Sequence, residues 1–82
     1  MNKNKLQIIA NEYNEYAQAI GYYRKVNNTE QFGRAWQSCE SSTNAIYVLI
    51  MHLGIADCFD KVYVESTLAG TTFNWWKMIV KD

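Results

Sequence analysis

The chain has 82 residues, of which 49% are hydrophobic and 15% aromatic, and its eight basic residues balance its eight acidic ones. This composition excludes a disordered chain. A neutral protein with only two arginines is also a poor candidate for gripping phosphate backbones, and it lacks the dense acidic face of a nucleic-acid mimic. The length predicts a single small globular domain over residues 1–82.

Neither end of the sequence nor its middle indicates export or membrane insertion. The N-terminal stretch MNKNKLQIIANEY lacks the apolar core of a signal peptide. The longest apolar run, residues 45–51, has seven residues, whereas a membrane span needs about 20. We therefore expect a cytoplasmic protein without a membrane partner, in which Cys39 and Cys58 are reduced, although their pairing stays open. Abundant Asn, Lys, Ile and Tyr indicate a low-GC bacterium or one of its mobile elements.

The first helix is predicted over residues 3–27. Its main apolar stripe advances by three and four residues and consists of Leu6, Ile9, Tyr13, Tyr16, Ile20 and Tyr23. A second, weaker stripe predicts another contact and consists of Ile8, Ala19, Tyr22 and Val26. Gly21 costs about 1 kcal/mol against alanine inside a helix, which favours either a close backbone approach or a tolerated weak spot.

The second helix is predicted over residues 29–53, after a break at residues 27–29. Its stripe keeps one phase throughout and consists of Phe32, Trp36, Cys39, Thr43, Ile46, Ile50 and Leu53. The polar cluster at residues 41–44 allows a bend, but the unbroken stripe favours one helix, and Gly54 just past its end is a stop signal. Residues 45–53 are apolar nearly all the way round, so we expect the rest of the chain to enclose them.

Residues 55–82 allow two interpretations. As helix, Asp57 caps one short element and Gly70 ends it. As a β-hairpin, a turn at Ala69-Gly70 sets Tyr63 opposite Trp76, but Ala-Gly is a weak turn and both faces of the second strand would be apolar. We favour an all-α fold, an antiparallel hairpin of two long helices covered by one or two short C-terminal helices. The alternative is α+β with a C-terminal β-hairpin.

The residue types needed for thiol chemistry occur close together in sequence. His52 is followed by Asp57, Cys58 and Asp60. None of these residues, with or without Cys39, has the spacing of a known nucleophilic or zinc site. We expect no enzyme activity, no catalytic residues, no cofactor and no metal.

The aromatic residues are the most unusual feature, because tyrosine and tryptophan dominate protein-binding hot spots. Most of them have core spacing, and the apolar side chains left over are the candidate partner-binding residues: Ile8, Tyr22, Val26, Tyr47 and Trp75. Base stacking is the rival use, but it usually needs a basic groove, so nucleic acid is disfavoured as a partner.

We therefore expect a small non-enzymatic protein-binding module. Small accessory proteins of mobile elements often inhibit larger bacterial proteins, anti-CRISPR proteins among them, and size and composition associate this chain with that group. The alternative is a homo-oligomeric structural or adaptor protein.

Overall fold

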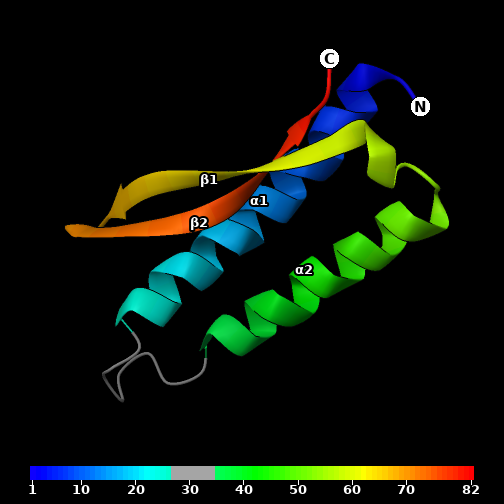
Figure 1. Cartoon of the computed structure of the whole chain (residues 1–82). Coiled ribbons are helices and arrows are strands. Elements are labelled where there is room, and N and C mark those ends of the chain that lie inside the picture. Colours follow the sequence, from blue (N-terminus) through cyan, green and yellow to red (C-terminus); the bar gives the residue numbers. More distant parts are fainter. Residues whose placement is uncertain (27–34) are drawn as a thin grey trace.

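The chain forms an antiparallel pair of helices and a C-terminal β-hairpin (Figure 1). The computed structural model describes residues 1–26 and 35–82. Within them the elements are α1 (Lys3–Val26), α2 (Ala35–His52), a 3-10 turn (Ala56–Cys58), β1 (Phe59–Leu68) and β2 (Thr71–Val80). The fold is α+β, so the all-α prediction is wrong and the hairpin alternative matches. The predicted break and the predicted start of the second helix lie outside the described residues.

The two strands are joined by the two-residue turn Ala69-Gly70. Both residues have positive φ, 49° at Ala69 and 78° at Gly70, as the tightest hairpin turns require. The pairing runs unbroken from Phe59 with Val80 to Leu68 with Thr71, and it sets Tyr63 opposite Trp76 as the alternative predicted.

The hairpin buries different faces along its length. Near the turn, Phe73 and Trp75 are buried, and two residues apart on a strand they share a face. Near the open end, the buried residues Met78 and Phe59 belong to the opposite face. The twist of the two strands explains this change, because a twisted hairpin turns first one face and then the other toward the same neighbouring element. Apolar residues on both faces, which argued against a hairpin in the sequence, are a consequence of this geometry.

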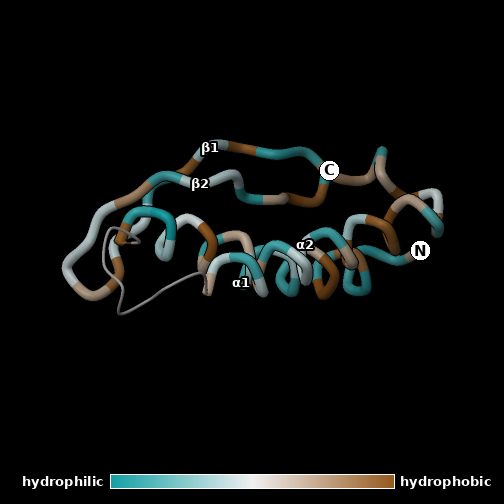
Figure 2. The backbone as a smooth tube through the Cα atoms, turned by 90° about the horizontal axis from the view of Figure 1, so that it is seen from below, coloured by the Kyte–Doolittle hydropathy of each residue, from teal (hydrophilic) through white to brown (hydrophobic). Residues whose placement is uncertain are grey.

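That neighbour is α1, and β2 lies directly on it. Asn14 Nδ2 donates to the Met78 carbonyl oxygen at 2.8 Å, and Asn14 Oδ1 accepts from the Met78 backbone N–H at 2.7 Å. A Cβ atom at Gly21 would lie 3.0 Å from the Phe73 ring and 3.1 Å from the Trp75 Cβ, so the close approach there favours glycine. In Figure 2, β2 runs between β1 and the helices.

The hairpin therefore covers α1 and leaves much of residues 45–53 open, so the predicted enclosure of that run is wrong. The main core cluster consists of Leu6, Ala10, Ile50, Ile55, Phe59 and Met78. Of residues 45–53, Ile50 alone is buried, with Ile46 partly buried beside it. The reason is that the backbone N–H and C=O of Met78 in β2 are hydrogen-bonded by Asn14 of α1, which holds the hairpin over α1 and not over α2.

The described part of α2 is continuous through the polar cluster at residues 41–44. The Ser42 hydroxyl donates to the Ser38 carbonyl at 3.2 Å, and the Thr43 hydroxyl donates to the Glu40 carbonyl at 2.8 Å. Both hydroxyls thus bond within the helix and do not compete with it. The helix ends at His52, and Gly54 just beyond it has a φ of 67°, which confirms the predicted stop.

Candidate protein-interaction surface

The C-terminal half of α2 and the residue that follows it expose a set of large apolar side chains, which we call the α2 apolar face. Each member is between 42% and 58% exposed, and the set consists of Tyr47, Val48, Leu49, Met51 and Leu53. Because Ile50 alone in this run is buried, the apolar residues lie on several sides of the helix. Contiguous exposed apolar surface of this kind is typical of an interaction site.

Charge is nearly absent from this helix. Glu40 is the single Asp, Glu, Lys or Arg residue of α2 (Ala35–His52), and its carboxylate lies 2.7 Å from the Arg24 guanidinium. Arg24 also lies over the Trp36 ring at 5.0 Å from the centroid. A partner of the α2 apolar face would therefore be selected by apolar packing and not by charge.

A second cationic contact joins α2 to the rest of the molecule near its other end. Lys61 Nζ of β1 lies 5.4 Å from the ring centroid of Tyr13 in α1 and 5.0 Å from that of Tyr47 in α2. The ammonium group of Lys61 thus links β1 to both helices. It also fixes Tyr47 at the edge of the α2 apolar face.

Two open hollows lie between α2 and the hairpin. The larger, about 420 Å³, has a floor of α1 residues and an aromatic wall that includes Tyr63 and Trp76. The smaller, about 240 Å³, lies beside Tyr47 and Ile50. Lys61 lines the smaller hollow, and its ammonium lies over the ring of Tyr13, which lines the larger one.

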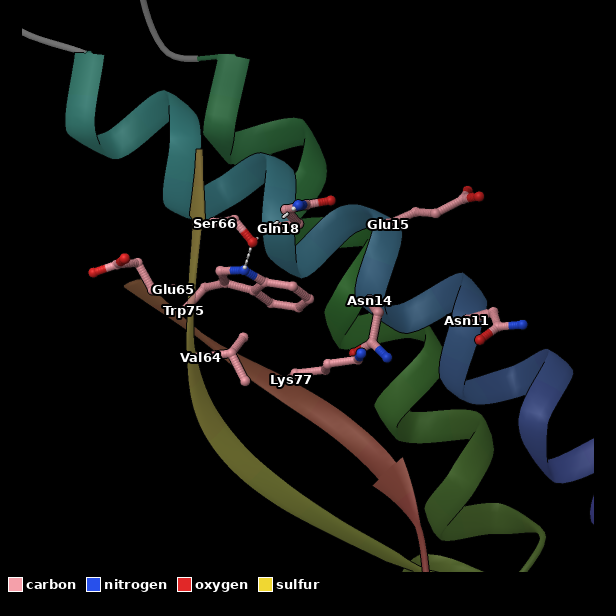
Figure 3. Close-up of a pocket in the computed structure, with 9 residues that line it drawn as sticks. All are labelled: Asn11, Asn14, Glu15, Gln18, Val64, Glu65, Ser66, Trp75 and Lys77. Atoms are coloured by element: carbon pink, nitrogen blue, oxygen red, sulfur yellow. Dashed lines mark hydrogen bonds between the residues drawn. The ribbon is translucent and has the colours of Figure 1, made fainter. Parts of the chain in front are cut away.

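A third hollow, about 540 Å³, lies on the other side of the hairpin and has a polar lining (Figure 3). The Trp75 indole N–H donates to the Ser66 hydroxyl at 2.8 Å, and Gln18 Nε2 approaches the same oxygen at 3.2 Å. Its two carboxylates, Glu15 and Glu65, point away from each other in Figure 3. The arrangement therefore offers no pair of acids converging on one substrate atom.

The five candidate residues have different environments. Ile8 is 67% exposed and Tyr47 belongs to the α2 apolar face. Tyr22 and Val26 are partly buried, and Tyr22 packs edge-to-face on Phe73 with ring centroids 5.9 Å apart. Trp75 is buried in the contact with α1, whereas its neighbour Trp76 is 56% exposed.

Sequence reasoning missed Val48, Leu49, Met51 and Leu53 as surface residues, because an apolar run reads as core. It also missed Tyr63 and Trp76, which form an exposed cross-strand pair with ring centroids 4.8 Å apart. Trp75 and Trp76 point to opposite faces of a strand, so a strand assignment would have indicated that the two tryptophans differ in exposure.

The residues considered for thiol or metal chemistry are not assembled into a site. Cys39 and Cys58 are free and partly buried, and His52 is exposed. Within residues 1–26 and 35–82, no three His, Cys, Asp or Glu side chains are grouped so as to hold a metal ion. In the same residues, neither helix has a stretch apolar and long enough to cross a membrane.

No known protein family, curated protein or solved structure matches this chain.

Proposed function

We propose that this protein is a non-enzymatic protein-binding module and that the α2 apolar face is its binding surface. The observation that carries the proposal is the exposure of five large apolar side chains, four on the last turns of α2 and Leu53 just past its end. Removing apolar surface from water is favourable by roughly 25 cal/mol for each Å² that becomes buried. A partner that buries these side chains gains this free energy on binding.

The shape of the surface indicates the form of the partner. Val48, Leu49 and Met51 point in different directions around the helix, since successive residues are about 100° apart. A flat surface could not cover all three. A hydrophobic groove that receives a helix, with few charges along its walls, fits this arrangement best.

Substitutions on the α2 apolar face test the proposal. The tagged protein, its Val48→Glu and Met51→Glu variants and a matched control, Gln37→Glu, would be used to capture proteins from a lysate of the native host. Gln37 is exposed on the same helix but lies outside the apolar face. We expect the wild type and Gln37→Glu to retain the same protein, and both apolar-face variants to lose it.

Circular dichroism would show that all four proteins keep the fold, because the substituted side chains are exposed. Equal capture by all four proteins would contradict the proposal. The narrower hypothesis of a mobile-element-encoded inhibitor adds a further expectation, that the captured protein is a larger bacterial protein whose activity falls on binding.

A further inference from the structure

The outer edge of β1 carries backbone groups that bond to no described residue. Met78 directs its N–H and C=O to Asn14, hence away from β1. In an antiparallel pair of strands, the backbone N–H and C=O groups of successive residues point alternately toward the partner strand and away from it. Residues that lie opposite each other point theirs in the same sense, both inward or both outward. Lys61, opposite Met78, therefore points its backbone groups outward, as do Tyr63, Glu65 and Thr67. The bond from the Lys81 N–H to the Cys58 carbonyl oxygen confirms that the alternate residues face β2.

This edge is long, regular and open. The pairing with β2 continues over ten residues without a bulge, and the chain has no proline. In Figure 2, β1 is the strand farther from the helices. Such an edge is a template for another strand, and proteins commonly protect it with charged side chains. β1 has three charged residues, Asp60, Lys61 and Glu65. Asp60 lies on the other face, 3.7 Å from Lys81 Nζ. Lys61 and Glu65 have opposite signs and lie on one face, two residues either side of Tyr63.

We propose that a second copy of this chain pairs with this edge, β1 against β1, about a two-fold axis through Tyr63. In this antiparallel register Lys61 of each copy lies opposite Glu65 of the other copy. Val62 lies opposite Val64 in the same way, and the two Tyr63 residues face each other. The charges that would block an unrelated strand thus become two symmetric attractive pairs. To form them, each Lys61 ammonium would turn from the Tyr13 and Tyr47 rings, which it contacts within one copy, toward Glu65 of the other copy. The product is a four-stranded antiparallel sheet.

The neighbouring registers lack this complementarity. Centring the pair on residue 61 or 65 places Lys61 or Glu65 opposite its own copy, which brings like charges together. Centring it on residue 62 places Lys61 opposite Tyr63, and centring it on residue 64 places Tyr63 opposite Glu65. The Tyr63-centred register is therefore selected by charge, in the way that cross-strand pairs select register in other sheets.

The same register accounts for two exposed aromatic residues. Tyr63 and Trp76 are 61% and 56% exposed and share a face of the sheet. Pairing about Tyr63 would join them into one row across four strands, Trp76 and Tyr63 of one copy followed by Tyr63 and Trp76 of the other. Aromatic pairs opposite each other on a sheet are among its stabilising contacts.

The dimer uses an edge of the molecule that the proposed function does not use. A two-fold axis perpendicular to the sheet places the helices of the two copies at opposite edges, so the α2 apolar face of each stays open. The inference thus goes beyond the binding surface on α2. Lys61 is the residue that touches both surfaces, because its ammonium lies 5.0 Å from the Tyr47 ring centroid.

Charge reversal with rescue tests the inference. Molar mass would be measured by sedimentation from micromolar to millimolar concentration, and we expect it to rise from the monomer value of 9.6 kDa toward twice that value. Glu65→Lys should weaken the dimer roughly tenfold or more, because the like-charge contact occurs twice. The double variant Lys61→Glu/Glu65→Lys should restore dimerisation. Lys77→Glu, a reversal on β2 away from the edge, should leave it unchanged.

Amide hydrogen exchange gives a second readout on the same samples. Dimerisation should protect the amides of Lys61, Tyr63 and Glu65, and Glu65→Lys should remove this protection while circular dichroism shows an intact fold. A wild type that stays monomeric at every concentration overturns the inference. So does a dimer that Glu65→Lys leaves intact, or one that the double variant fails to restore.

Discussion

The side-chain amide of Asn14 in α1 holds both backbone polar groups of Met78 in β2, through bonds of 2.8 Å and 2.7 Å. Asn14 is buried, so water does not replace it as a partner. The amide therefore makes the two hydrogen bonds that a residue of a third strand would make to Met78. It occupies this edge of β2 and attaches the sheet to α1. This contact explains why the hairpin lies on α1 and why α2 remains open.

Asn14→Ala should lower the free energy of unfolding by about 1–3 kcal/mol, because a buried N–H and a buried C=O lose their partner. Chemical denaturation of the variant and of the control Asn11→Ala would measure the change. Asn11 is exposed one turn earlier on α1, so its replacement should change stability by less than about 0.5 kcal/mol. Equal effects at the two positions would show that the Asn14 contact has no special role.

Ala69→Asn should stabilise the protein. Ala69 has a φ of 49°, a conformation that is unfavourable for alanine and well tolerated by asparagine. We expect a gain of about 0.5–1 kcal/mol, seen as a higher midpoint in thermal unfolding. Ala69→Val, which is β-branched, is the matched opposite and should lower the midpoint. A lower midpoint for Ala69→Asn would mean that the turn differs from the one described.

The adjacent tryptophans should respond differently to truncation. Trp75→Ala removes a buried side chain and its hydrogen bond to Ser66, so it should cost about 3–5 kcal/mol. Trp76→Ala removes an exposed ring paired with Tyr63, and it should cost about 1 kcal/mol or less. Urea denaturation of both variants would measure the two costs. The reverse order would show that the hairpin presents its opposite face to α1.

Asp82 should titrate below the usual range of an aspartate. Its carboxylate accepts a hydrogen bond from Lys3 Nζ at 2.6 Å, and this bond together with the lysine charge lowers the pKa of Asp82. A lowered pKa in the folded state means that the interaction is present at neutral pH and is lost as the pH falls through the acid range. NMR titration should show the pKa rising toward its ordinary value in Lys3→Ala. An unchanged titration in that variant would exclude the contact.

The sequence alone predicted the helices and the candidate hairpin turn but not the final fold class. The stop at Gly54 and the pairing of Tyr63 with Trp76 both follow from local chemistry, glycine at positive φ in one case and turn length in the other. The choice between helix and hairpin depends on a distant contact. Asn14 reads as a solvated residue until β2 is placed beside it, and no local pattern reveals that pairing.

The candidate surface was harder to predict for a related reason. An apolar run such as residues 45–53 reads as core, and whether it becomes core depends on which helix the hairpin covers. Ile8 and Tyr47 are exposed, but Trp75 is buried and Trp76 is not. Adjacent residues on a strand point to opposite faces, so the two tryptophans can be distinguished only when the strand and its twist are known.

The most direct test of the proposed function is photo-crosslinking from the α2 apolar face in cells of the native host. A benzoylphenylalanine side chain at position 48 should form one discrete adduct with a different protein, and the same group at position 37 should not. This result would place a partner on the outer side of α2. The absence of an adduct at position 48, equal adducts at both positions, or an adduct with a second copy of this chain would contradict the account.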